Sequence, residues 1–248
     1  MPALRVKSGM TERPNGAPAR RAGPIDVELW PSALAARVVE PGPLPRIHGY
    51  DVEDDLARHY SFAEITLTAL TGTAPERGHG RAFEIALAFL APVPVNEAPG
   101  HAAGLARLIG ADASGVISGA AMGLAERARH LVSTHAELIA WLDSGSGDVP
   151  PSTQTDDPND THAVARLRAA LAETGASFPL LNTRPTLMAA LIGVLHGVGL
   201  TDAPRIETAL AFAGLPATVA EAFAVKPFAF FSYPMDLPAF RYVEDADG

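Results

Sequence analysis

The sequence predicts an all-α protein, and three observations carry that prediction. Apolar residues recur at helical spacing through most of the chain after residue 46, and no segment alternates cleanly enough to indicate a strand. Ser, Asp, Pro and Gly stand where the successive helices should begin and end. The chain has 248 residues, of which 48% are hydrophobic, so it is long enough to bury a sizeable core.

The first helices are expected from their caps. Ser61 is placed to cap a helix that Gly72 ends, and Pro75 prevents it from resuming. A helix over 81–90 follows, and then one over 101–109 with Pro99 in its first turn. Residues 115–135 are rich in Gly, Ala and Ser, which allows helices to approach closely.

The second half of the chain offers several candidate caps. Asp160 or Thr161 is expected to cap a helix that runs to residue 173, and Asn182 or Thr183 a helix over 185–198. Asp202 is expected to cap a helix over 203–213 that ends at Gly214, and a last short helix should run over 216–224. At least seven helices are therefore predicted.

Two segments are expected to lie outside the helical body. Residues 1–45 contain recurrent Pro, Gly and Arg, which predicts an arm that is disordered or draped over a partner subunit. Residues 144–161 contain no apolar side chain to bury except Val149, which predicts an exposed loop. The helical domain is therefore expected to span residues 46–248.

The composition excludes several classes of protein. The absence of cysteine excludes disulfides, thiolate nucleophiles and cysteine-ligated metal centres, and no histidine spacing indicates any other metal site. The net charge of −9 disfavours nucleic-acid binding, which needs clustered Lys and Arg. The longest apolar stretch, residues 186–200, is shorter than the about 20 residues that span a membrane. We expect a cytoplasmic protein that binds neither nucleic acid nor membrane.

An ordered set of short motifs resembles a known superfamily. Residues 46–75 contain Gly49-Tyr50-Asp51, Ser61-Phe62 and a Thr-Gly-Thr-Ala-Pro stop at 71–75. Further similar segments are PVNEAPGHAAGLARL at 94–108, an Asp-Pro pair at 157–158, and the Asn-led apolar stretch 182–199. In this order they resemble the citrate synthase superfamily, particularly its short citryl-CoA lyase-like members.

The resemblance implies a fold and an activity. The fold would be a compact version of the family's large and small helical domains, assembled as a homodimer. The reaction would join or separate an acyl-CoA and a keto acid such as oxaloacetate, with the coenzyme A thioester as substrate and no tightly bound cofactor. In that chemistry an acidic side chain removes a weakly acidic α-proton while a His stabilises the enolate oxygen.

The departures from the family fall on its catalytic positions. Asn96-Glu97-Ala98-Pro99 stands where the family has Asp-His-Gly-Pro, and Arg184 stands in place of the catalytic Asp. Asn159 replaces an Arg, and the family's His-Gly-Gly-Ala and Gly-x-Gly-His segments are missing; His135 is the nearest candidate for the first. Catalysis would therefore depend on other residues.

Glu97 and His101 are the candidate acid/base residues. If Pro99 begins a helix, both lie near its electropositive end, and the pKa of an imidazole is normally near neutrality. Asn96, Arg107 and Arg184 are the candidate substrate-binding residues, because guanidinium groups hold carboxylates with two parallel hydrogen bonds. The alternative roles are structural: Glu97 would complement the helix dipole, His101 would be solvated, Arg107 would meet a carboxylate of the protein, and His196 would be packed.

Two functional interpretations remain open. In one, the pocket has different catalytic residues and performs a related reaction on an acyl-CoA or a di- or tricarboxylate. In the other, the chain is a catalytically inactive member of the family, a pseudoenzyme that binds a ligand or pairs with an active paralogue.

Overall fold

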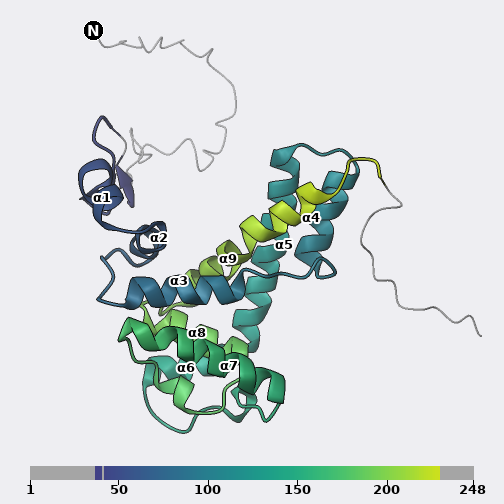
Figure 1. The fold of residues 1–248 in the computed structure, drawn as a ribbon. Coiled ribbons are helices and arrows are strands. Elements are labelled where there is room, and N and C mark those ends of the chain that lie inside the picture. The colour runs from purple at the N-terminus through teal and green to yellow at the C-terminus, as the bar shows by residue number, and fades with distance from the viewer. Residues whose placement is uncertain (1–36, 41, 230–248) are drawn as a thin grey trace, which may run out of the picture. The chain divides into compact units, whose positions relative to one another are not determined.

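The structure is a computed structural model that describes residues 37–40 and 42–229. Helices form most of this part of the chain (Figure 1), which confirms the prediction of an all-α fold. Within the described residues the strands are limited to a small antiparallel sheet in the order β1-β2-β3: Val39–Glu40, Arg46–Ile47 and Tyr50–Asp51. Because β1 pairs with β2, residues 37–40 of the expected arm belong to the folded unit, and residues 1–36 lie outside the described part.

The N-terminal helices follow the local signals in the sequence. A turn of π-helix over Val52–Leu56 leads into α1, Ala57–His59, and the Asp51 carboxylate accepts hydrogen bonds from the first backbone N–H groups. Helix α2, Phe62–Thr71, begins with a capping box between Ser61 and Glu64. It ends at Gly72, whose φ of 85° is the left-handed conformation that glycine adopts without strain.

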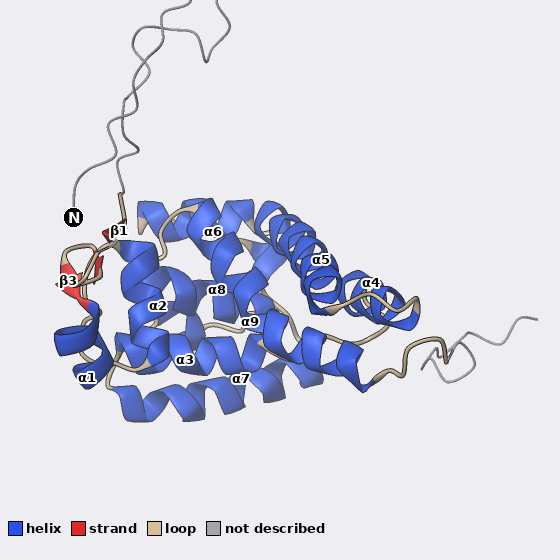
Figure 2. Cartoon of the chain, turned by 90° about the horizontal axis from the view of Figure 1, so that it is seen from above, coloured by secondary structure: helices blue, strands red, loops and turns tan. Residues whose placement is uncertain are grey.

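A large core lies around α3 and α8. Helix α3 spans His79–Leu90 and α8 spans Leu187–Gly197, and α6 (Ala136–Ser144) and α7 (Pro158–Leu171) pack against them. Every residue of α8 from Ala189 to Leu195 is buried. Figure 2 shows α8 in the middle of this group, and α3, α6, α7 and α9 all contact it.

A second, smaller core joins three other helices. Helix α4 spans Ala98–Leu108, and the two 22-residue helices α5 and α9 span Ala113–Thr134 and Ala203–Ala224. The buried cluster that these helices share consists of small residues: Ala103, Val116, Ala120 and Ala222. Small side chains at the contact let the helix backbones approach closely, as the Gly- and Ala-rich composition indicates.

The caps of α7 and α8 differ from the predicted ones. Helix α7 begins at Pro158 with Asp157 as its cap, and Asp160 instead accepts a hydrogen bond from the Leu187 backbone N–H at the start of α8, at 3.0 Å. Helix α8 is capped by Thr186 rather than by Asn182 or Thr183. The reason is that Pro179–Asn182 forms a 3-10 turn, so the α-helix begins one turn later than expected.

Helix α9 does not end at Gly214, and it continues through Pro216 to Ala224. A Cβ at Gly214 would lie 2.8 Å from Val93 and 2.9 Å from Leu124, so this glycine serves close packing rather than helix termination. By length and composition α9 alone among the described helices is apolar enough to cross a membrane, but it packs here against α3, α4, α5 and α8. A core helix of a soluble protein has the same character.

The segment 144–161 is more ordered than the exposed loop expected of it. Residues Pro151–Thr153 form a 3-10 turn in which Thr153 is buried. The Thr153 carbonyl accepts a hydrogen bond from the Thr186 N–H at 2.8 Å, and the Thr155 N–H donates to the Arg184 carbonyl at 2.9 Å. The segment is therefore paired with the residues that precede α8.

Candidate functional site

The least exposed ion pair at a predicted site residue is the one between Glu97 and Arg127. Glu97 lies immediately before α4, and Arg127 projects from α5. The Arg127 Nε donates to Glu97 Oε2 at 2.6 Å, and the two side chains are 25% and 39% exposed, respectively. The pair borders a wide hollow of about 600 Å³ whose remaining walls are mostly apolar, contributed by Ala98, Pro99, Ala102, Gly119, Met122, Gly123 and Glu126.

Two glycines allow this pair to form. A Cβ at Gly123 would lie 2.8 Å from the Pro99 Cα, so only glycine lets the first turn of α4 rest directly on α5. A Cβ at Gly100 would lie 2.8 Å from the Val95 Cα, so the chain can also fold back tightly before α4. Arg127 follows Gly123 by four residues on the same face of α5, and it therefore faces the start of α4.

The Glu97–Arg127 pair retains hydrogen-bonding groups for a ligand. Apart from the bond to Glu97, the guanidinium of Arg127 makes no side-chain hydrogen bond to the described part of the chain. Its two terminal nitrogens therefore retain the fork that binds a carboxylate. Glu97 makes no capping bond, and the N-terminus of α4 adds positive potential beside it.

Two of the other predicted residues lie near Glu97 without lining this hollow. Asn96 is exposed in the turn before α4. His101 is half-buried in the first turn, and its backbone N–H donates to the Glu97 carbonyl at 2.9 Å. The hollow thus brings Glu97 together with Arg127 and leaves the imidazole outside its lining.

The two predicted arginines lie elsewhere. Arg107 is ten residues beyond Glu97, about 15 Å along the helix axis. Its guanidinium stacks on Phe223 at 5.3 Å, and its buried Nε has no hydrogen-bond partner among the described residues. Arg184 pairs with Asp156 before α8, and its side chain is 72% exposed. The structure therefore does not gather Glu97 and the two arginines into one site.

His135 stands at the junction of α5 and α6. Its Nδ1 is 2.8 Å from the Leu131 carbonyl, and its backbone N–H bonds the same carbonyl at 3.1 Å. These contacts close the last turn of α5, so the imidazole acts as a local helix terminator in this structure.

Arg127 was not predicted to be a site residue. It is 30 residues from Glu97, and its surroundings, GLAERARH, resemble any solvated helix face. The pairing arises only when α4 folds back on α5. Gly123, four residues before Arg127, was the one local signal, because a glycine at that position indicates close contact with another helix.

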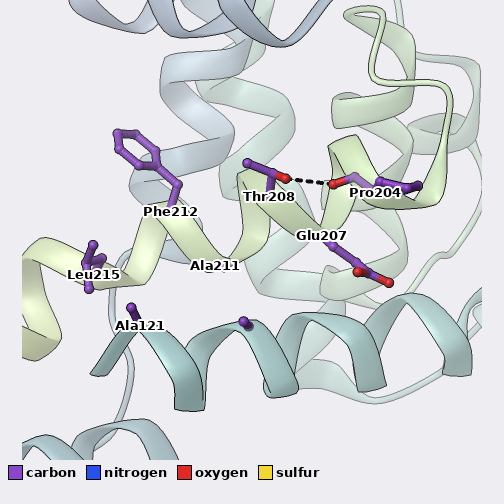
Figure 3. Close-up of a pocket in the computed structure, with 8 residues that line it drawn as sticks. Ala121, Pro204, Glu207, Thr208, Ala211, Phe212 and Leu215 are labelled. Atoms are coloured by element: carbon purple, nitrogen blue, oxygen red, sulfur yellow. Dashed lines mark hydrogen bonds between the residues drawn. The ribbon is translucent and has the colours of Figure 1, made fainter. Parts of the chain in front are cut away.

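A second hollow, of about 450 Å³, lies between α5 and α9 (Figure 3). Apolar residues of both helices line it, among them Ala121, Ala125, Ala211, Phe212 and Leu215. The hydroxyl of Thr208 donates to the Pro204 carbonyl of its own helix at 2.7 Å, which occupies its one proton. The walls are mostly apolar, and Glu207 of α9 is the carboxylate among the residues that line them.

Comparison with known proteins places the fold. No family model and no curated protein sequence matches the chain. Among solved structures, citryl-CoA lyase from Hydrogenobacter thermophilus is similar over 85% of this chain and 96% of its own, with a TM-score of 0.57 and 16% identity. A mutant ATP citrate lyase from Methanosaeta concilii, in complex with (3S)-citryl-CoA, is similar over 88% of this chain but 43% of its own, with a TM-score of 0.57 and 13% identity. The chain therefore has the citrate synthase-like all-α fold of these proteins.

Proposed function

We propose that the chain binds a coenzyme A thioester and a keto acid, or the citryl-type adduct of the two, and forms or cleaves the carbon–carbon bond between them. The observation that carries this proposal is the fold likeness to citryl-CoA lyase, which extends over 96% of that enzyme. The motifs at 46–75 and 94–108 are consistent with it, and the hollow beside Glu97 offers a guanidinium for a carboxylate.

The proposed roles follow from the chemistry of the bond. In the cleavage direction a base takes the proton of the tertiary hydroxyl, the carbon–carbon bond breaks, and the thioester enolate then accepts a proton. Glu97 is the proton acceptor in this proposal, and Arg127 holds a substrate carboxylate through its terminal nitrogens. His101, in the first turn of α4 and outside the lining of the hollow, is proposed to assist proton transfer.

We also propose that a second copy of the chain covers the α5–α9 face. Met122 on α5 is 72% exposed and Ile117 is 43% exposed, and Phe62 packs against Phe212 while remaining 73% exposed. Only 39% of the most apolar stretch of α9 is buried within the chain. Apolar surface of this kind is typical of helices that pack at a subunit contact.

The direct test supplies acetyl-CoA with oxaloacetate or another keto acid and follows the formation of the citryl-type thioester by chromatography. Formation of the carbon–carbon bond leaves the thioester intact, so free thiol appears only if water then hydrolyses it, and the chain, which contains no cysteine, contributes no thiol background to that second measurement. We expect keto-acid-dependent formation of the thioester that Glu97→Gln lowers by about 100-fold, the usual contribution of a general base. Glu84→Gln, which removes a similar ion-paired carboxylate on α3, is the control and should leave the rate unchanged.

The second candidate is the inactive family member that binds a ligand or pairs with a paralogue. It is favoured by the ion pairs that occupy Glu97 and Arg184, and by the Arg at the position of the family's catalytic Asp. Calorimetric titration with coenzyme A and citrate separates the two candidates. Binding that Arg127→Met weakens, without any turnover of citryl-CoA or acetyl-CoA, would establish the binder.

A further inference from the structure

A separate pocket of about 370 Å³ lies at the C-terminal end of α8. Its walls come from the end of α6, from α8 and from residues 177–180, where the chain enters the 3-10 turn Pro179–Asn182, and they are largely aromatic or aliphatic. Trp141, Phe178 and Leu180 are among the apolar residues that line it, and His196 contributes a ring nitrogen donor or acceptor. It shares no residue with the hollow beside Glu97.

The walls of this pocket are held in place by close contacts. A Cβ at Gly193 would lie 2.7 Å from Leu180, and one at Gly197 would lie 2.8 Å from the ring of Phe178. The two glycines therefore let residues 177–180 rest directly on α8. On the other side, the Trp141 indole N–H donates to the Gly147 carbonyl at 3.0 Å, which fixes the indole through its polar edge. A preformed apolar pocket with few polar groups is typical of small-molecule sites.

The polar feature of the pocket is a histidine that Asp143 orients. The His196 side chain is 14% exposed, and its Nε2 lies 2.9 Å from Asp143 Oδ1. An ionised carboxylate only accepts hydrogen bonds, so the proton of the neutral imidazole must be on Nε2. The other ring nitrogen, Nδ1, makes no hydrogen bond to the described part of the chain and is an acceptor in this tautomer.

We infer that this pocket binds a small planar aromatic molecule that carries one O–H or N–H donor, as a phenol or an indole does. The ring would pack against Trp141 and Phe178, and its donor would bond to His196 Nδ1. The volume is near the lower end of small-molecule sites, about 300 to 1,000 Å³, which suits one or two fused rings. The site is independent of the proposed carbon–carbon chemistry.

The test uses Trp141 as the reporter. The chain has two tryptophans, so Trp30→Phe leaves Trp141 as the single emitter. Phenol and toluene, which are similar in size but differ in the donor, are titrated separately while the emission is recorded. We expect saturable changes with both, and about 5-fold tighter binding of phenol, equivalent to one net hydrogen bond. A response that does not saturate, or equal affinities, would overturn the assignment.

Variants then test the role of the histidine. His196→Phe should abolish the preference for phenol, whereas His162→Phe, at an exposed position on α7, should preserve it. Asp143→Ala removes a half-exposed carboxylate, frees the imidazole to protonate either nitrogen, and should reduce the preference about 2-fold. Circular dichroism checks that each variant is folded. If His196→Phe does not fold, the test is the preference of Asp143→Ala for phenol over toluene. An unchanged preference in the folded variants would contradict the proposal.

Discussion

The two ends of the helical body differ in how completely they bury their apolar side chains. Around α3, α6, α7 and α8 the core is large, and no described residue of α6, α7 or α8 is a large exposed apolar side chain. At the other end the core is small, and most of the large exposed apolar residues lie on or beside α4, α5 and α9: Leu105, Ile109, Ile117, Met122, Phe223 and Phe228. The second end is therefore the one that we propose a second copy covers, and it also contains the Glu97–Arg127 pair.

The largest effect is expected from a charge on the exposed face of α5. If a second copy covers this face, Met122→Asp should weaken self-association by at least about 30-fold, the cost of losing an interface hot spot. Leu44→Asp, at a similarly exposed site in the hairpin region, should leave association unchanged. Analytical ultracentrifugation over a concentration series measures both, and a Met122→Asp protein that associates like the native one would show that this face is free.

The two cores are compared by one matched pair of substitutions. Val194 on α8 and Val116 on α5 are both 0% exposed, but they belong to the large and the small core, respectively. Val194→Ala should lower the free energy of unfolding by about 2 to 3 kcal/mol, and Val116→Ala by about half as much, because fewer buried neighbours line the space it leaves. Urea unfolding gives both values, and equal losses would remove the distinction between the two cores.

The Glu97–Arg127 pair should matter more for binding than for stability. Both side chains are partly exposed, so Arg127→Met should change the free energy of unfolding by less than about 1 kcal/mol. The same variant should bind citrate about 10-fold more weakly, because the carboxylate fork is lost. Arg129→Met, at an exposed ion pair on the same helix, is the matched control for calorimetry. A large loss of stability with unchanged citrate affinity would make the pair structural.

The smallest effect concerns the helix caps at the two ends. The Ser114 hydroxyl, at 2.7 Å, and the Gly115 N–H, at 3.1 Å, hold the pKa of the exposed Asp112 carboxyl at the start of α5 below its usual value of 3.8. Because the folded-state pKa is the lower one, this stabilisation is full above pH 3.8 and is lost as the pH falls through the folded-state value.

The difference in urea midpoint between the native protein and Asp112→Asn should therefore shrink at acid pH. Thr186→Ala removes the cap of α8, which does not titrate, so its effect should not follow the same pH dependence. If the Asp112→Asn difference were constant between about pH 6 and pH 3, the carboxyl would contribute no pH-dependent stability.

The sequence by itself determined the helical class and those helix ends that depend on neighbours within one turn. Ser61, Gly72, Pro99 and Asp202 act where they were predicted, because a cap bonds backbone groups two or three residues away. The ordered motifs at 46–75 and 94–108 also anticipated the citrate synthase-like fold that the solved structures share.

Only the tertiary structure decided the rest. Asp160 was as good a local cap as Asp157, but it accepts a hydrogen bond from the start of α8 instead. Gly214 was predicted to end a helix, but it lies inside α9 and allows Val93 and Leu124 to pack closely there. The partner of Glu97 depended on α4 folding back against α5. The helix ends and the ion pair depend on groups far apart in the sequence. A tertiary contact that buries apolar surface or pairs a charge outweighs the local preference for a cap or a helix end.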